Sequence, residues 1–414
     1  MIVGGGGREH ALCWRLAPES EVICAPGNPG IAEVAECVPL ASDDGEGLAA
    51  LAREREVDLV LVGPEAALIA GLADQLRSFG LAVLGPGAAG ARLEADKGWS
   101  KDAMRRAGVP TAAGQTFTDV GQAIEWCRER FEEGKGVAVK ATGPALGKGV
   151  VVAESFETAE ATIRDWMELG GLGLAGEKVL LEERLVGREF SLLTFANERG
   201  IASLPIAQDY KRLGDGDEGP NTGGMGSFAP ADWVSEGLVL MTEERVVKPL
   251  LSDLARAGIH YRGVLFSGLM VVEDKPYCLE YNVRFGDPET QSVVRLAGAG
   301  FLECLLATAG GEYPERCETL PGAAVTVVCA SEGYPAAPRK GQEIRLGAMP
   351  EGVVVFHAGT RLEDGEIRVA GGRVLGVSAH GPDARTARER AYTGVGLVQF
   401  EGKTFRTDIA KAGN

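Results

Sequence analysis

Short apolar runs alternate with amphipathic stretches through the first 95 residues of the chain. The runs predict strands, and the stretches between them, with apolar residues at helical spacing, predict helices. Strands that alternate with helices in this way are typical of an open, mostly parallel sheet. The predicted strands are 2–3, 22–24, 58–62 and 81–84, and the predicted helices are 9–17, 45–54 and 66–79.

Glycine-rich turns follow these strands, at the edge of the sheet where ligands bind in open α/β proteins. The four-glycine turn before the first helix is a candidate phosphate cradle, because free N–H groups at a helix start favour anions. It is not a dinucleotide fingerprint, since His10 stands where a third glycine is needed. A tight turn required for close packing explains it equally well. The turn residues considered are Gly5, Gly6, Gly7, Asn28, Gly63, Pro64 and Glu65.

Polar and apolar residues also alternate over residues 277–284, which predicts a strand that ends at Gly286. Residues two apart share a face, so Glu280, Asn282 and Arg284 would project together. This set suits a site that holds Mg²⁺ beside phosphate, since Mg²⁺ binds oxygen ligands and Arg binds phosphate. From the alternation alone, a solvated face of an amphipathic strand is the favoured interpretation. The apolar face is predicted to contain Leu279, Tyr281 and Val283.

Two further predicted strands flank a glycine-rich loop over residues 143–149. Lys140 ends the first strand, and Lys148 lies between Gly147 and Gly149. Glycines allow close approach of backbone N–H groups to phosphate, and Lys adds a positive charge, so we expect a phosphate lid. It is not a Walker A loop, because its spacing is one residue short and Gly149 replaces Ser or Thr. The alternative is a plain hairpin turn.

Residues 207–227 are polar and glycine-rich with little periodicity. We therefore predict a long irregular loop, and loops of this length inside a compact domain are often functional. A helix is predicted over 241–257 and a strand over 263–272. From about residue 318 short strands alternate with Pro and Gly turns, and no catalytic candidate stands out; His357 and His380 are interpreted as packed or surface residues. The remaining elements predicted there are strands 323–330, 353–357 and 372–379 and helix 384–393.

Composition narrows the class of protein. The chain has 414 residues, 59 of them Gly, and a net charge of −17, which argues against nucleic acid as the main partner. Its eight Cys and four His residues form no Cys-x-x-Cys pair, which argues against a structural zinc site. No 18-residue apolar run and no signal-peptide pattern is present, so we expect a cytoplasmic protein with no membrane partner.

Several longer motifs, in their order along the chain, resemble those of the glycinamide ribonucleotide synthetases, a family of the ATP-grasp superfamily. The resemblance implies three domains, namely an N-terminal α/β domain (1–95), an ATP-grasp domain (96–317) with a mobile lid (about 112–185), and a small β-rich C-terminal domain (318–414). The fold class is thus α/β and α+β, multidomain. The matching motifs are 6–12, 63–65, 208–226, 284–291, 356–360 and 371–375.

The resemblance also implies a reaction and its ligands. In this family, also called phosphoribosylamine–glycine ligases, ATP phosphorylates glycine and the amine of 5-phosphoribosylamine attacks the glycyl phosphate, which is the second step of purine biosynthesis. ATP and Mg²⁺ or Mn²⁺ are implied, and the protein would be a monomer or homodimer. The metal ligands would be Glu280 and Asn282; ATP would contact Lys101, Lys140, Gly147, Lys148, Gly149, Glu182, Leu185 and Glu189; the substrates would contact the turn residues above and Asp209, Lys211, Asn221, Thr222, Arg284 and Asp287, with Arg284, Asp287 and Lys148 catalytic.

The chain departs from the family pattern at a few positions. Thr142 stands where the family usually has Asp, Tyr210 where it usually has His, and residues 408–411 differ from the usual C-terminal ending. Two other classes stay open at this stage. One is an ATP-grasp ligase for a different amine acceptor, and the other is a non-catalytic nucleotide-binding paralogue. A dinucleotide-dependent dehydrogenase is disfavoured by the missing third glycine.

Overall fold

The N-terminal unit is built on a parallel five-stranded sheet in the order β3-β2-β1-β4-β5. The computed structural model describes residues 1–145 and 149–411. The predicted helix 66–79 is wrong in one respect, because Gly71 adopts φ 89° and divides it into two helices. The elements are β1 (Ile2–Gly4), α1 (Gly7–Leu16), β2 (Ile23–Pro26), β3 (Glu36–Cys37), α2 (Gly45–Glu54), β4 (Val60–Val62), α3 (Glu65–Ile69), α4 (Leu72–Ser78), β5 (Val83–Leu84) and α5 (Ala88–Ala95).

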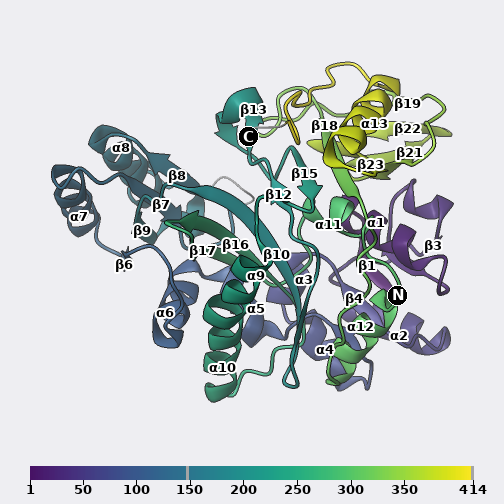
Figure 1. Ribbon diagram of the computed structural model, residues 1–414, viewed down its shortest axis with the longest axis horizontal. Helices are drawn as coiled ribbons and strands as arrows, with labels where there is room; N and C mark the ends of the chain where they lie inside the picture. The colour runs from purple at the N-terminus through teal and green to yellow at the C-terminus, as the bar shows by residue number, and fades with distance from the viewer. Residues whose placement is uncertain (146–148, 412–414) are drawn as a thin grey trace.

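A second unit forms the lobe at the left of Figure 1. Its antiparallel sheet has the order β6-β9-β7-β8, and two helices pack on it to give a separate core that contains Phe117, Ile163 and Trp166. Side chains cap both helices: Asp119 accepts from the Gln122 N–H, and Ser155 from the Thr158 N–H. The elements are β6 (Gly114–Phe117), α7 (Val120–Glu132), β7 (Val137–Ala141), β8 (Val150–Ala153), α8 (Phe156–Met167) and β9 (Val179–Glu183).

The central antiparallel sheet has the order β11-β10-β16-β17 and joins the other units. The helix predicted over 241–257 begins earlier, at Glu236, and is interrupted by a π-helical turn over Glu243–Val247. The elements are α6 (Lys97–Ala107), β10 (Arg188–Ala196), β11 (Ile201–Ser203), α9 (Glu236–Thr242), α10 (Lys248–Arg256), β16 (Gly263–Val272), β17 (Lys275–Asn282), α11 (Glu289–Val293) and α12 (Phe301–Gly310).

The C-terminal sheet, at the upper right of Figure 1, has the order β12-β15-β18-β23-β20. Two of its strands come from residues 207–229, so the prediction of an irregular loop there is wrong. The polar segment is ordered by pairing with β18, which lies about 100 residues later and which its own pattern does not reveal. The elements are β12 (Gln208–Asp209), β13 (Arg212–Gly214), β14 (Glu218–Asn221), β15 (Gly226–Ala229), β18 (Ala323–Ala330), β19 (Arg345–Leu346), β20 (Val353–His357), β21 (Thr360–Glu363), β22 (Glu366–Val369), β23 (Arg373–Gly381), α13 (Ala384–Leu397) and β24 (Val398–Gln399).

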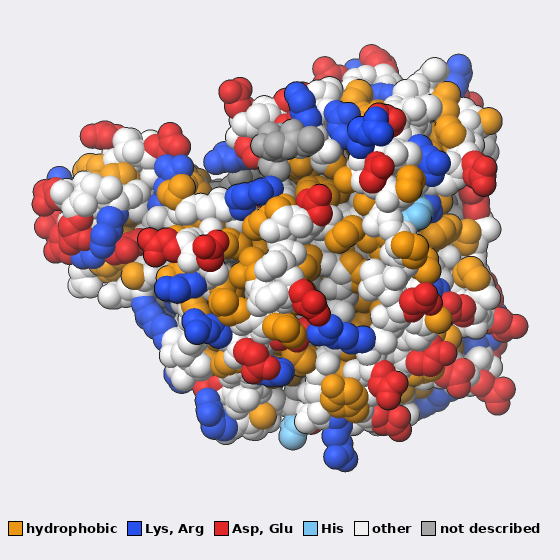
Figure 2. Space-filling model, viewed as in Figure 1, with side chains coloured by type: hydrophobic (Ala, Val, Ile, Leu, Met, Phe, Trp, Pro, Cys, Tyr) orange, Lys and Arg blue, Asp and Glu red, His pale blue; other side chains and the backbone are white. Residues whose placement is uncertain are grey.

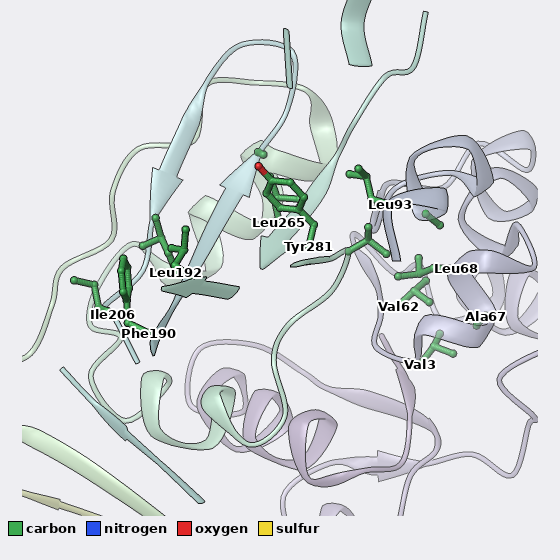
Figure 3. Packing of buried hydrophobic residues seen from close by; sticks show 14 of the residues in the cluster. Val3, Val62, Ala67, Leu68, Leu93, Phe190, Leu192, Ile206, Leu265 and Tyr281 are labelled. Carbon is green, nitrogen blue, oxygen red and sulfur yellow. The ribbon is translucent and has the colours of Figure 1, made fainter. Parts of the chain in front are cut away.

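One apolar core runs from the N-terminal unit into the central sheet (Figure 3). Burial of large apolar side chains on this scale is the main force that holds units together. Within the described residues, no helix has both the length and the apolar character needed to cross a membrane. The labelled members of the core are Val3, Val62, Ala67, Leu68, Leu93, Phe190, Leu192, Ile206, Leu265 and Tyr281.

Candidate active site

A cleft of about 880 Å³ lies where the lobe of α7 and α8 meets the central and C-terminal sheets. Figure 2 shows the surface hollowed beside this lobe, with Lys and Arg side chains around the hollow. Because the cleft draws residues from every unit, no single segment builds it. The predicted site residues that line it are Glu65, Lys101, Lys140, Gly149, Glu182, Leu185, Glu189, Asp209, Lys211, Asn221, Thr222, Glu280, Asn282, Arg284 and Asp287.

Strand β17 carries the predicted metal ligands into the cleft. Glu280 pairs with Gly268 of β16 and Asn282 with Phe266, so both side chains face the same way. Tyr281 and Val283 are buried behind them, as predicted. Leu279 is not, because a register shift on this strand pair puts Cys278 in the buried position and leaves Leu279 lining the cleft. A bulge of this kind has no signal in the alternation.

The Glu280 carboxylate is surrounded by cations. Burial opposes its ionisation, but Lys211, Lys140 and Lys97 outweigh burial and hold the pKa of Glu280 below its usual value. Among the described residues, no group of three or more His, Cys, Asp or Glu side chains could hold a metal ion. One carboxylate and one amide oxygen nevertheless fit Mg²⁺, which commonly takes one or two protein ligands and completes its shell with phosphate and water.

Two lysines and one glutamate form a buried cluster beside β17. Both carboxylate oxygens of Glu182 are engaged, one by Lys101 at 2.7 Å and the other by Lys140 at 2.6 Å. Lys140 also donates to the Leu279 carbonyl, and Lys101 to Thr111. All three side chains are less than 10% exposed. When ionised, the cluster carries one excess positive charge at low dielectric, which suits a polyphosphate.

The pKa values of the three groups follow from this packing. Burial lowers the pKa of Lys101 more than Glu182 raises it. Burial also lowers the pKa of Lys140, but the charge and hydrogen bond of Glu182 outweigh burial, so the pKa of Lys140 is raised. For Glu182 itself, burial is outweighed by Lys140 and Lys101, so its pKa is lowered. The packing thus favours the ionised forms of Lys140 and Glu182, whereas burial works against the charge of Lys101. An adenine contact from Glu182 stays a prediction, since both oxygens are used by the lysines here.

Acidic groups gather farther along the cleft, around Lys211. Its ammonium lies 3.3 Å from Glu189 and 3.9 Å from Glu280. Burial, and then the charges of Glu189 and Glu280, raise the pKa of Asp209 to about 6. Burial and the charge of Asp209 raise the pKa of Glu289 to about 8. A cleft lined by both acidic and basic side chains can orient a ligand that carries both signs.

Arg284 is held from the N-terminal unit. Its Nη2 donates to Glu94 at 2.9 Å, and the other oxygen of Glu94 accepts from the Val283 N–H. Glu65 lies 3.6 Å from the Arg284 Nε. That Nε is buried and, within the described residues, has no hydrogen-bond partner. The geometry thus leaves one guanidinium donor available to a ligand.

Asp287 is held from the C-terminal sheet. Arg373 of β23 donates to its carboxylate at 2.8 Å and to its carbonyl at 2.7 Å, and it also contacts the Gly223 carbonyl. Tyr334 accepts from the Gly223 N–H at 2.9 Å. Tyr334 and Arg373 both line the cleft, and the sequence analysis, which found no catalytic candidate after residue 318, missed them. Nothing around residue 373 in the sequence indicates that it reaches residue 287.

The predicted turn residues are used in a different way. The side-chain amide of Asn28 donates to the Gly5 and His357 carbonyls, and its oxygen accepts from two backbone N–H groups, of Gly30 and Ile31. A Cβ on Gly5 would lie 2.5 Å from the Gly27 carbonyl oxygen, so close packing explains this glycine. Substrate contact by the turn residues outside the lining stays a prediction; they are Gly5, Gly6, Gly7, Asn28, Gly63 and Pro64.

Several cleft residues were missed by the sequence analysis, and two predicted ones lie outside the described residues. Gly147 and Lys148 belong to the latter group. Lys97 contacts the Gly143 carbonyl at 3.4 Å at the start of the glycine-rich loop, and Asn221 donates to the Val150 carbonyl at its end. Arg8, Glu289 and Arg373 had a signal, since they lie in the matching motifs 6–12, 284–291 and 371–375. Other missed residues of the lining include Glu94, Lys97, Arg188 and Tyr334.

Comparison with known proteins gives matches over nearly the whole chain. Three family models match it: "Phosphoribosylglycinamide synthetase, N domain" over residues 1–94, the ATP-grasp (A) domain of the same enzyme over 95–290, and its C domain over 324–412. A phosphoribosylamine–glycine ligase of Brucella melitensis is 42% identical over 99% of this chain and 96% of its own length.

Solved structures agree. The crystal structure of a phosphoribosylamine–glycine ligase from Thermotoga maritima matches with a TM-score of 0.85 and 36% identity, over 98% of both chains. The biotin carboxylase domain of a Hydrogenobacter thermophilus 2-oxoglutarate carboxylase, solved with MgADP, matches with a TM-score of 0.72 and 17% identity, over 98% of this chain and 91% of that one. This second likeness is one of fold alone.

Proposed function

The chain belongs to the phosphoribosylglycinamide synthetase family, and we propose that it uses ATP to join glycine to 5-phosphoribosylamine. The products are glycinamide ribonucleotide, ADP and phosphate, within purine biosynthesis. The observation that carries the proposal is the match of all three family domains, in order, to a chain whose cleft brings together the residues of the resembling motifs.

The reaction has two steps. A carboxylate oxygen of glycine takes the γ-phosphoryl group of ATP, which gives glycyl phosphate and ADP. The amine of phosphoribosylamine then attacks the acyl carbon; a C–N bond forms, the C–O bond to phosphate breaks, and the amine loses a proton. No side chain needs to act as a nucleophile, so the protein contributes positioning and charge. Aligned reactants account for roughly 7–11 kcal/mol of barrier lowering.

The phosphate end of the cleft is assigned to the lysine cluster and β17. Lys101 and Lys140 would bind ATP phosphates, and Lys148 would join them from the glycine-rich loop. Glu280 and Asn282 would hold Mg²⁺ or Mn²⁺, which when bound draws charge from phosphate oxygens. The low pKa of Glu280 supports this role, because a carboxylate must be ionised to bind a cation.

The acceptor end is assigned to the residues around Arg284 and Lys211. The Nε of Arg284, which has no hydrogen-bond partner among the described residues, would bind a substrate oxyanion, and Asp287, fixed by Arg373, would orient the amine.

The nucleoside part of ATP is assigned to three other residues of the cleft. Glu182 and the backbone at Leu185 would contact adenine, and Glu189 the ribose. The chain would act in the cytoplasm, a reducing compartment, in keeping with its eight free cysteines.

The test is ADP release from ATP and Mg²⁺ with glycine, with and without phosphoribosylamine made in situ from ribose 5-phosphate and ammonia. We expect full turnover to require both substrates and the product to have the mass of glycinamide ribonucleotide. Glu280→Gln should abolish turnover, whereas Glu273→Gln, an exposed carboxylate at the turn before β17, should not. Tight ATP binding without turnover would overturn the proposal and favour a nucleotide-binding paralogue; turnover with another amine would favour a different acceptor.

A further inference from the structure

A second cavity, of about 410 Å³, lies away from the cleft, between the N-terminal unit and the C-terminal sheet. Trp14 of α1 forms one wall, and Arg295, which follows α11, lies against it with the guanidinium carbon 4.6 Å from the ring centre. The opposite side is formed by Gly352, by His380 at the end of β23, and by Arg390 of α13. None of these residues belongs to the site described above.

Arg295 differs from the other buried arginines. Among the described residues, four arginines are less than 10% exposed, and three of them form ion pairs: Arg8 with Glu9, Arg15 with Glu19, and Arg406 with Asp408 and Asp217. No described carboxylate forms an ion pair with Arg295. A buried charge without an opposite charge is costly, which is why such groups are normally paired.

The partners of Arg295 are uncharged. Its Nη2 donates to the Gly352 carbonyl at 2.6 Å, and its face rests on Trp14. Burial alone lowers the pKa of Arg295 to about 10, with no neighbouring carboxylate acting against it. The guanidinium still carries its charge at neutral pH, so the pocket holds a cation whose counter-charge the described residues do not supply.

Two more basic side chains face the same cavity. Arg390 donates to the His380 carbonyl at 2.8 Å and, within the described part of the chain, forms no ion pair. The His380 ring contacts the Pro321 carbonyl through Nε2 at 2.9 Å. Glu351, at the exposed rim, is the one acidic residue of the lining. The cavity therefore combines two guanidinium groups and an imidazole against one solvated carboxylate.

We propose that this pocket binds a small oxyanion, a phosphate or a carboxylate, which supplies the counter-charge of Arg295. Guanidinium groups bind both anions through parallel N–H donors, and the partly buried position strengthens the attraction. A volume of about 410 Å³ admits an anion that carries a small organic group. The proposal does not depend on the ligase reaction, and its test uses no turnover.

The test is calorimetric titration of the full chain with inorganic phosphate and, separately, with acetate. The non-hydrolysable ATP analogue with an imido bridge, with Mg²⁺, is kept saturating so that the nucleotide end of the cleft is filled. We expect Arg390→Gln to weaken binding at least tenfold. Arg385→Gln is the matched control, since Arg385 is exposed on the same helix and contacts Glu389 instead. Arg295→Lys, which keeps the charge but loses the fork, should weaken binding to a smaller extent than Arg295→Gln.

The two titrants separate the two sources of the oxyanion. If phosphate or acetate binds, and the binding is weakened by Arg390→Gln but not by Arg385→Gln, the result would support the pocket. The titrant that behaves in this way would identify the anion. Equal isotherms in the wild type, Arg390→Gln and Arg295→Lys would overturn the proposal, because the bound anion would then lie elsewhere. Circular dichroism of each variant checks that it is folded, and the exposed position of Arg390 keeps the test valid if the Arg295 variants fail to fold.

Discussion

Two polar clusters are buried to a similar extent in this protein, but one contains ion pairs and the other contains neutral side chains. In the cleft, Lys101 and Lys140 both form ion pairs with Glu182, so each charge has an opposite one within 2.7 Å. At the contact between the N- and C-terminal units, His10 and His357 are just as buried, but no carboxylate pairs with them in the described residues. Burial, with mutual repulsion for His10, lowers their pKa values to about 3 and about 4, so both are neutral.

The difference shows where function can lie. In the neutral cluster one ring nitrogen of each histidine is used internally: the backbone N–H of His357 donates to the His10 Nδ1 at 2.8 Å, and the His357 Nδ1 contacts the Thr360 hydroxyl at 3.2 Å. It joins the N- and C-terminal units and carries no net charge that would attract an ion. The charged cluster has an unequal number of cations and anions, so it attracts an anion from outside. Excess charge at depth, more than burial or polarity alone, marks the site.

Removing the anion of the charged cluster should have the largest effect. Glu182→Gln keeps the shape but leaves two buried lysines facing each other, so we expect a loss of about 3–5 kcal/mol in the free energy of unfolding. Glu183→Gln, the next residue on β9, breaks only partly exposed pairs with Lys135 and Arg130 and should cost less than about 1 kcal/mol. Urea unfolding of both variants checks this, and equal losses would contradict a charged core.

The neutral cluster should reveal itself through pH. In the unfolded state the histidines have a pKa near 6.5 and bind protons below that pH, whereas in the folded state they stay neutral down to about pH 4. Their contribution to the free energy of unfolding is therefore fully present above pH 6.5 and is lost as the pH falls. At pH 5 each histidine should account for roughly 2 kcal/mol of that loss. His10→Gln should remove about this much of the decrease between pH 7 and 5, measured by urea unfolding. An unchanged pH profile would mean that His10 is protonated in the fold.

Sequence reasoning succeeded where the signal is local. The alternation over 277–284 placed Glu280 and Asn282 correctly on one strand face, since two-residue periodicity depends only on neighbours. It failed where a partner comes from far along the chain. The Arg373–Asp287 pair, the pairing of β15 with β18, and the bulge that turns Leu279 toward the cleft all join segments that no local pattern connects. Whether a polar side chain is free for a ligand is likewise decided by tertiary contacts, as Asn28 shows.

Asn28 tests whether a polar residue beside the histidine cluster serves packing or substrate binding. The family resemblance assigned it to substrate, whereas the structure gives it four internal hydrogen bonds, one of them to the His357 carbonyl. Asn28→Ala should cost about 1.5 kcal/mol in the free energy of unfolding, since it leaves partly buried backbone groups unpaired. If Asn28 acts only in packing, the KM for phosphoribosylamine stays within about twofold at a temperature where the variant is folded. A rise of tenfold or more, about 1.4 kcal/mol, would return it to the substrate site.

Tyr210 offers the smallest and most specific test, because it is a neutral group that lines the charged cleft. Its ring lies 4.8 Å from the Arg406 guanidinium, and its hydroxyl accepts from the Ala410 N–H at 2.9 Å, so it fixes the altered C-terminal segment against β12. Tyr210→Phe keeps the ring and loses only the hydroxyl, so we expect a loss of about 1 kcal/mol in the free energy of unfolding. Tyr313→Phe, with an exposed ring, is the control and should change nothing. Ligase turnover should fall by less than about threefold, because the hydroxyl holds a segment and not a substrate; a loss of a hundredfold, about 2.7 kcal/mol, would mean that it contacts the reacting groups.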